Sequence, residues 1–201
     1  LSLAKEHIIA AKESGADAVK IQTYSAQTMT LNSKNKDFYI KAGRWKGQTL
    51  YDLYKKAETP FDWHQELFEY SRAKNITIFS TPFDETAVDL LQKLNTPVYK
   101  VASFELTDLP LLTYISKTKK PILLSTGMSS QNEISSSLAV LKKYKKNNIL
   151  LFHCISEYPA CLSKSNLGMI NLLKEFGTLV GLSDHTLGEE ASIVATTLGV
   201  S

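Results

Sequence analysis

Short apolar runs alternate with amphipathic segments along most of this chain. From residue 61 onward, each apolar run is followed by a stretch in which apolar side chains recur every three or four positions. The first pattern is typical of strands covered on both faces of a parallel sheet, and the second is typical of helices packed on such a sheet. Parallel α/β folds bind ligands at the rim formed by the carboxyl ends of their strands. Hydroxyl groups are expected at that rim because five runs end in serine: 77–80, 100–103, 122–125, 153–156 and 180–183.

The pattern predicts six strands, each followed by a loop and a helix. The strands are expected at 17–23, 76–80, 98–102, 121–124, 149–154 and 179–182. The helices are expected at 3–14, 62–74, 85–94, 109–116, 131–144, 166–176 and from 189 onward. Residues 24–60 have no strong period apart from a short helix at 50–57. An ordered connection of this length is typically functional.

Regular alternation of strands and helices fits either an open doubly wound sheet or a closed (β/α)8 TIM barrel. The doubly wound fold usually has a glycine-rich turn after its first strand, and no G-x-G-x-x-G sequence occurs here. We therefore expect an α/β TIM barrel. Because a barrel has eight strands and about 250 residues, residues 1–201 are expected to be a partial barrel with about six of the eight strands. The chain starts inside a helical pattern without methionine, so one strand is expected before Leu1 and another after Ser201.

Composition narrows the class of protein. The formal charge is +3, and no basic patch is interleaved with aromatic residues, so we expect no nucleic-acid partner. The lysine run 142–146 is expected to be a solvated helix end. No apolar run reaches the roughly 18 residues of a membrane span, and no signal peptide opens the chain. We therefore expect a cytoplasmic protein. Its two cysteines, Cys154 and Cys161, are too few for a disulfide framework, and we expect both thiols to pack.

Two lysines lie within predicted strands. Lys20 shares a strand face with Gln22, and Lys100 lies in the apolar run 98–102. A lysine inside a buried strand is costly unless it is paired or used, so we expect both lysines to bind one anionic ligand. Structural ion pairs at the rim are the alternative. A Schiff-base aldolase would also need a buried strand lysine such as Lys100.

Small polar residues accompany the lysines. Hydroxyls at Thr81, Ser103, Ser125 and Thr126, with the adjacent Gly127, predict a phosphate cradle, because phosphate binds cations, hydroxyls and exposed amides.

Three further residues are candidates for other roles. Glu105 is a candidate acid–base group, and Asp84 is expected to cap the helix that follows it. His185 fits a metal ligand, a general base or a packed histidine.

Six motifs occur here in the same order as in the sialic acid synthase family, which condenses phosphoenolpyruvate with an amino sugar. The resemblance runs from Gly15 to the end of the chain. Segments 37–45, 50–54 and 58–64 resemble the pseudaminic acid synthase branch of that family. The six motifs are Lys20-Ile21-Gln22, Ser80-Thr81-Pro82-Phe83-Asp84, Tyr99-Lys100-Val101-Ala102-Ser103, Ser125-Thr126-Gly127-Met128, His153-Cys154-Ile155-Ser156-Glu157-Tyr158-Pro159 and Ser183-Asp184-His185-Thr186-Leu187-Gly188.

The resemblance implies a transferase that forms a carbon–carbon bond at the open end of a barrel. Carbon 3 of phosphoenolpyruvate would attack the aldehyde of an open-chain 2,4-diacetamido-2,4,6-trideoxy hexose. Water would add at carbon 2, and phosphate would leave with C–O cleavage. The residues implied to hold the phosphate and carboxylate are Lys20, Thr81, Lys100, Ser103, Ser125 and Ser183.

The resemblance also implies roles near the reacting carbons. Gln22, Ser156 and Tyr158 would line the site there, Glu105 would face the intermediate or the sugar, and His185 would bind Mn2+ or Mg2+. Such an ion would polarise the aldehyde as a Lewis acid. The family often has asparagine where this chain has Ser156.

Several alternatives stay open. The same chemistry could act on N-acetylmannosamine or on the legionaminic precursor, Lys100 could form a Schiff base, or a non-catalytic barrel could bind phosphoenolpyruvate without turnover. The family's first strand would precede Leu1, while its second metal histidine and its C-terminal antifreeze-like domain would follow Ser201. We therefore expect residues 1–201 to be inactive alone and the full-length protein to be a homodimer.

Overall fold

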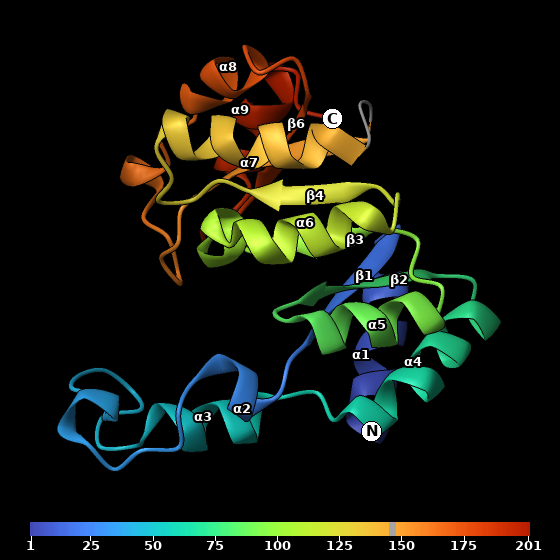
Figure 1. The fold of residues 1–201 in the computed structure, drawn as a ribbon. Coiled ribbons are helices and arrows are strands. Elements are labelled where there is room, and N and C mark those ends of the chain that lie inside the picture. The colour runs from blue at the N-terminus through green and yellow to red at the C-terminus, as the bar shows by residue number, and fades with distance from the viewer. Residues whose placement is uncertain (145–147) are drawn as a thin grey trace. The chain divides into compact units, whose positions relative to one another are not determined.

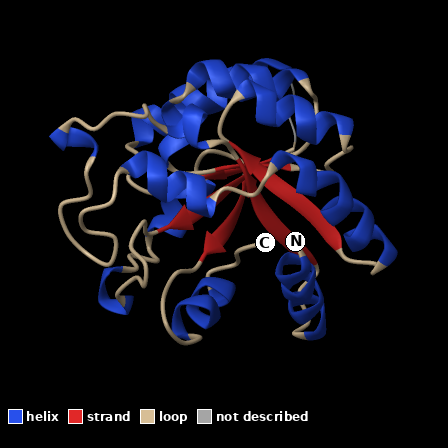
Figure 2. Cartoon of the chain, turned by 90° about the horizontal axis from the view of Figure 1, so that it is seen from below, coloured by secondary structure: helices blue, strands red, loops and turns tan. Residues whose placement is uncertain are grey.

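The computed structural model describes residues 1–144 and 148–201, without the side chain of Tyr144. It divides the chain into two compact units, Leu1–Pro97 and Val98–Ser201 (Figure 1). Strands and helices alternate along most of the chain, and Figure 2 shows the strands in red and the helices in blue. The described residues contain six strands, and every strand pair within a unit is parallel. None of the described helices is long and apolar enough to cross a membrane.

The first unit pairs two strands and packs helices on them. Its main elements are α1 (Ser2–Glu13), β1 (Ala18–Thr23), α4 (Phe61–Ala73), β2 (Thr77–Pro82) and α5 (Glu85–Lys93). The parallel register sets Gln22 opposite Thr81. The expected cap of α5 is confirmed, since the carboxylate of Asp84 accepts a hydrogen bond of 3.0 Å from Ala87 N.

The connection between β1 and α4 is ordered. It contains α2 (Ala26–Met29), the 3-10 turn η1 (Lys36–Phe38) and α3 (Leu50–Ala57), and it stands apart from β1 and β2 in Figure 1. The carboxylate of Glu58 accepts a hydrogen bond of 2.9 Å from Ala26 N and pairs with Lys55. Sequence predicted α3 with its observed bounds, whereas α2 and η1 were not predicted. Glu58 therefore joins the two ends of the connection.

A buried hydrogen-bond chain fixes the carboxyl end of β1. Thr23 Oγ1 lies 2.8 Å from His64 Nε2 and 2.6 Å from Ser80 Oγ. Ser80 Oγ donates to Ile21 O at 3.0 Å, and His64 Nδ1 donates to Pro60 O at 3.0 Å. Burial lowers the pKa of His64 and favours the neutral imidazole. His64 therefore packs in the core, and Ser80 is not a rim hydroxyl, because β2 continues to Pro82 and encloses it.

The second unit is a four-stranded parallel sheet with neighbours in the order β3, β4, β5, β6. Its strands are β3 (Tyr99–Val101), β4 (Ile122–Ser125), β5 (Ile149–Cys154) and β6 (Leu179–Ser183). Its helices and 3-10 turns are η2 (Phe104–Thr107), α6 (Leu109–Lys117), α7 (Gln131–Tyr144), η3 (Leu162–Lys164), α8 (Met169–Lys174) and α9 (Glu190–Thr197). Of the lysine run 142–146, Lys145 and Lys146 lie outside the described residues.

Alternation along these strands separates the core from a second face. The core face is almost completely buried. It is formed by Tyr99, Val101, Ile122, Leu124, Ile149, Leu151, His153 and Val180. His153 is part of this packing, because its Nε2 lies 2.7 Å from Ser165 O.

The opposite face is organised in rows by the strand register. Lys100, Leu123, Leu150 and Leu179 form the row nearest the amino ends. Ser125, Phe152 and Gly181 form the next row, and Cys154 pairs with Ser183 in the last. This face therefore carries the candidate chemistry.

The structure corrects two further expectations from the sequence. The helix expected at 166–176 is shorter, since α8 spans Met169–Lys174. Cys154 packs as expected, but Cys161 is exposed rather than packed. The remaining expected strands and helices are confirmed, with ends that shift by one or two residues.

Replacing Thr23 with valine tests the buried hydrogen-bond chain. Thr23→Val keeps the side-chain shape but leaves His64 Nε2 and Ser80 Oγ without their shared partner, so we expect it to lower the free energy of unfolding by about 1–3 kcal/mol. Urea denaturation measures the change. The control is Thr77→Val, at an exposed position on the neighbouring strand. An equal loss in both variants would contradict the network.

Candidate functional site

Lys100 and three serines form what we call the hydroxyl cluster: Lys100, Ser103, Ser125 and Ser156. The ammonium group of Lys100 donates hydrogen bonds to Ser125 Oγ and, at 2.9 Å, to Val101 O. Ser125 is the last residue of β4 and is 4% exposed. The positive charge of Lys100, a residue of β3, therefore lies at the carboxyl end of β4.

Gly127 brings the other two serines of the cluster together. A Cβ atom at this position would lie 2.7 Å from Ser156 Oγ and 2.8 Å from Ser103 Oγ, which is closer than real Cβ atoms approach their neighbours. Because glycine lacks that atom, the two hydroxyls occupy the space. Cys154 joins them, with its Sγ 3.3 Å from Ser103 Oγ.

The hydroxyl cluster has the chemistry of an anion site. One ammonium group and three hydroxyls can together bind phosphate or carboxylate oxygens. Thr126, also expected in this cradle, has a structural role instead. Its N–H and its hydroxyl both donate to Phe152 O, at 3.1 and 2.9 Å.

Glu105 lies in η2 and follows Ser103 of the hydroxyl cluster closely in sequence. Among the described residues, its Oε2 is buried and has no hydrogen-bond partner. Burial raises the pKa of Glu105, and the negative charge of Asp108 raises it further, while its own backbone N–H and the charge of Lys100 oppose the shift. A carboxyl group with a raised pKa retains its proton more readily and is suited to act as a general acid.

His185 is held by backbone and aromatic contacts in the turn after β6. Its Nδ1 donates to Ile155 O at 2.7 Å, and its ring lies 4.2 Å, between centroids, from the ring of Tyr158. Because a carbonyl oxygen only accepts, this hydrogen bond makes Nε2 the acceptor of the ring, and Nε2 accepts a hydrogen bond of 3.3 Å from Ser183 Oγ. Metal-binding histidines are commonly oriented in this way.

The role of His185 as a metal ligand stays a prediction. An ion could bind Nε2, the unprotonated ring nitrogen, in place of the hydrogen bond from Ser183. In residues 1–144 and 148–201, no group of three or more His, Cys, Asp or Glu side chains could hold a metal ion. Any ion at His185 would need its other ligands from elsewhere.

Asp184 was given no role by sequence reasoning, yet it shapes the turn that carries His185. Its carboxylate accepts hydrogen bonds of 2.9 Å from Thr186 N, Thr186 Oγ1 and Ser192 Oγ. Burial favours a higher pKa for Asp184, but these hydrogen bonds outweigh it and lower the pKa. The Asp-x-Thr spacing is a turn signal that could have revealed this.

The other predicted site residues lie in the first unit. Lys20 and Gln22 are on one face of β1, and Thr81, opposite Gln22, is almost completely buried. Lys20 was expected to be buried but is exposed, although the surrounding atoms desolvate its ammonium group enough to lower its pKa. Lys100 is half-buried. The structure therefore brings Gln22 and Thr81 together in one unit and the hydroxyl cluster together in the other.

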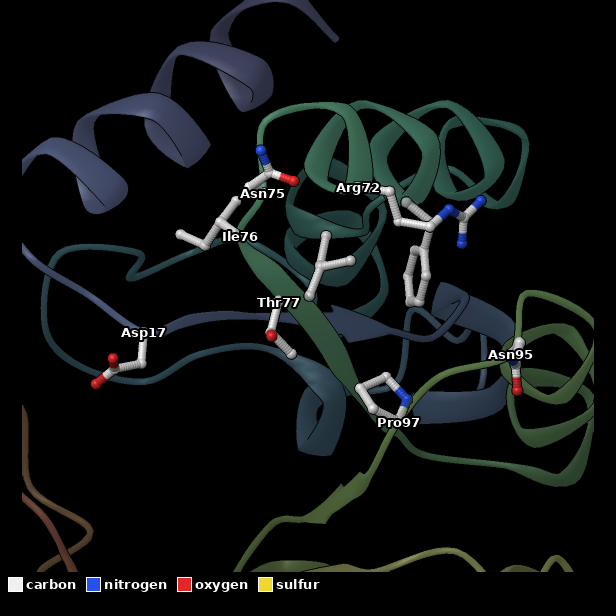
Figure 3. Close-up of a pocket in the computed structure, with 9 residues that line it drawn as sticks. Asp17, Arg72, Asn75, Ile76, Thr77, Asn95 and Pro97 are labelled. Atoms are coloured by element: carbon white, nitrogen blue, oxygen red, sulfur yellow. The ribbon is translucent and has the colours of Figure 1, made fainter.

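A pocket in the first unit does not coincide with these residues. It has a volume of about 390 Å³ and lies at the amino ends of β1 and β2, where Asp17, Arg72, Asn75 and Thr77 surround it (Figure 3). Thr81 is at the other end of β2. Since parallel α/β folds place their chemistry at the carboxyl ends of strands, this pocket is not the candidate site.

A Glu105→Gln variant tests the cost of the buried carboxylate. Because folding raises the pKa of Glu105, its contribution to stability is full below the unfolded pKa and is lost as pH rises through the folded pKa. Glutamine does not titrate, so as the pH rises from about 4 to neutral the variant should lose less stability than the parent, and at neutral pH it should be the more stable of the two.

Urea unfolding across that pH range measures the difference. The control is Glu6→Gln, at an exposed position on α1. If Glu105→Gln and Glu6→Gln have the same pH dependence, burial of Glu105 carries no cost.

The chain is similar in sequence to several known proteins. The chain is 47% identical to a pseudaminic acid synthase of Helicobacter pylori, and 40% identical to both a pseudaminic acid synthase and an N,N'-diacetyllegionaminic acid synthase of Campylobacter jejuni. These matches cover 99–100% of the chain but only 58–60% of the length of the relatives.

A solved structure of an N-acetylneuraminic acid (sialic acid) synthetase from Leptospira borgpetersenii, in complex with citrate, matches with a TM-score of 0.86 at 30% identity. The match covers 99% of this chain and 65% of that one. It confirms the expected α/β fold of the TIM-barrel class. The sequence profile of the NeuB family matches residues 7–201, and the chain therefore belongs to the NeuB family.

Proposed function

We propose that this chain forms the phosphoenolpyruvate-binding part of a pseudaminic acid synthase. The reaction joins phosphoenolpyruvate, a 2,4-diacetamido-2,4,6-trideoxy hexose and water, and releases the nonulosonic acid and phosphate. The observation that carries the proposal is the hydroxyl cluster, in which the Lys100 ammonium and three serine hydroxyls gather at the carboxyl ends of the strands. Phosphoenolpyruvate carries the phosphate and carboxylate that such a cluster binds.

The proposed chemistry forms a carbon–carbon and a carbon–oxygen bond and breaks the carbon–oxygen bond to phosphate. Carbon 3 of phosphoenolpyruvate bonds to the sugar aldehyde carbon, and the aldehyde oxygen takes up a proton. Water adds to carbon 2 and loses a proton, and phosphate then leaves from that carbon with its bridging oxygen as the new hydroxyl loses its proton and becomes the ketone oxygen. Glu105 would supply the proton, since its raised pKa favours the protonated form.

Further roles are proposed for the remaining predicted residues. In the second unit, Ser183 would bind phosphate or carboxylate together with the cluster, and Tyr158 would line the site near a reacting carbon. In the first unit, Lys20 and Thr81 are proposed to bind phosphate or carboxylate, and Gln22 is proposed to lie near a reacting carbon. His185 would provide one ligand to Mn2+ or Mg2+ through Nε2. When bound, the ion would polarise the aldehyde.

Two other readings are tested with the same protein. An N-acetylneuraminate or legionaminate synthase would use the same phosphoenolpyruvate site with a different sugar. A Schiff-base aldolase would instead form a covalent bond between Lys100 and a substrate carbonyl. Segments 37–45 and 58–64 and the 47% identity favour the pseudaminic sugar.

Three properties of the whole protein are proposed with the reaction. They are a homodimer, a location in the cytoplasm, and barrel strands and a C-terminal domain outside residues 1–201. The share of the relatives' length that the chain spans leaves room for those parts.

Phosphate release tests the proposed reaction. The assay uses the full-length natural protein that contains these residues. It is supplied with phosphoenolpyruvate, Mn2+ and one of three sugars: the pseudaminic hexose, the legionaminic precursor or N-acetylmannosamine. We expect turnover with the pseudaminic hexose, and Lys100→Met should lower kcat/KM on the order of 100-fold, since it removes a charged hydrogen-bond donor to the substrate.

Lys93→Met, an exposed lysine on α5, is the matched control and should keep its activity. Turnover only with another sugar would reassign the substrate. Absence of phosphate release with all three sugars would reject the proposal. A borohydride-trapped adduct on Lys100 would establish the aldolase instead.

Gly127→Ala tests the geometry of the hydroxyl cluster. The added Cβ would displace the hydroxyls of Ser103 and Ser156, so we expect KM for phosphoenolpyruvate to rise and the free energy of unfolding to fall by about 1–3 kcal/mol, as overpacking does. Gly168→Ala is the matched control, because a Cβ atom added there would meet no other atom within 4 Å. An unchanged KM in Gly127→Ala would show that the two serines do not contact this substrate.

A further inference from the structure

Phe152 lies beside Lys100 in the second unit. It occupies the middle row of the sheet face that carries the hydroxyl cluster, between Ser125 on β4 and Gly181 on β6. The ammonium of Lys100 lies over the ring of Phe152, 5.5 Å from its centroid. This distance is within the range of a cation–π interaction.

Neighbouring strands contact both the backbone and the ring of Phe152. The carbonyl oxygen of Phe152 accepts hydrogen bonds from both the N–H and the hydroxyl of Thr126, which joins β5 to the end of β4. A Cβ atom at Gly181 would lie 2.7 Å from Phe152 Cε1 and 2.9 Å from Cδ1. Because the φ angle of Gly181 is not in the left-handed region, glycine is needed there for space and not for its backbone freedom.

Three uncharged groups contact the ammonium of Lys100. They are the ring of Phe152, the hydroxyl of Ser125 and the carbonyl of Val101. The ring attracts the ammonium without adding a charge of its own, whereas a carboxylate in its place would form an ion pair and compete with an anionic ligand.

We propose that Phe152 is a positioning residue that holds the Lys100 ammonium in place to bind an anionic substrate, and that Gly181 provides the space for its ring. This inference rests on the proposed function, in which Lys100 binds the phosphate or carboxylate of phosphoenolpyruvate. Phe152 acts through Lys100 and does not contact the reacting atoms.

Fluorinated phenylalanines test the interaction directly. Each added fluorine withdraws electron density from the ring face and weakens its attraction for a cation, with little change in ring size. With one, two and three fluorines at position 152 of the full-length chain, we expect KM for phosphoenolpyruvate to rise stepwise, by about 3- to 30-fold in total, with little change in kcat. Phe152→Leu should show a similar loss, and Phe152→Tyr should keep the parent KM.

The same fluorinated series at Phe68 is the control. Phe68 is a ring of α4 that is 1% exposed, and no cation contact with it is found in the described part of the chain. In the series at Phe68, KM for phosphoenolpyruvate should stay constant. A KM that is insensitive to fluorination at position 152 would overturn the proposal and leave phosphoenolpyruvate turnover by the parent protein intact.

A readout without substrate separates this inference from the proposed function. Acetic anhydride labels exposed lysines, and mass spectrometry reports the rate at each site. Lys100 should be acetylated several-fold faster in Phe152→Leu than in the parent or in Phe152→Tyr, whether or not the protein turns over phosphoenolpyruvate. An equal rate in all three proteins would refute the positioning role.

Gly181→Ala tests the space for the ring. The added methyl group should displace Phe152 and raise both the KM and the acetylation rate of Lys100. In the double variant Gly181→Ala/Phe152→Leu, the ring that the methyl group would meet is absent, so we expect the KM of Phe152→Leu alone. Losses that add in the double variant would show that Gly181 and Phe152 act independently.

Discussion

An ammonium group half-buried in a parallel sheet has to be surrounded by electron-rich groups, because its desolvation is otherwise too costly. Around Lys100 those groups are a strand carbonyl, a serine hydroxyl and an aromatic ring. They come from three neighbouring strands, so their arrangement depends on the parallel register of β3, β4 and β5. The same register that buries the core face therefore sets the position of the charge on the opposite face.

The two faces of a strand give similar residues different roles. Ser80 and Ser125 both follow apolar runs, yet the hydroxyl of Ser80 is used inside the fold by Thr23 and Ile21 O, while that of Ser125 accepts from Lys100. Thr126 also faces inward to the neighbouring strand and holds Phe152. The serines therefore have to be sorted by face and register before any of them is assigned to a ligand.

Sequence periodicity was sufficient for the strands and most helices, because those elements are defined by local patterns of burial. It missed α2, where Glu58 accepts from Ala26 N across 32 residues of chain. It placed Ser80 at the rim because the partner Thr23 lies 57 residues away. The residue types of the candidate site were visible as motifs, but the approach of Ser103 and Ser156 over Gly127 depends on neighbouring strands and could not be read from spacing.

On the face of the second-unit sheet that carries the hydroxyl cluster, the side chains change from apolar to polar along the strand direction. This change explains why a cavity on that face is not the candidate site. A cavity of about 730 Å³ lies at the amino ends of β4, β5 and β6, against the leucine row of Leu123, Leu150 and Leu179. The next row, with Phe152, is mixed, and the last row leads into the serines. A small anion needs close oxygen and nitrogen contacts more than it needs volume. The serines at the carboxyl ends of the strands supply such contacts, whereas the leucine row at the amino ends offers only apolar surface.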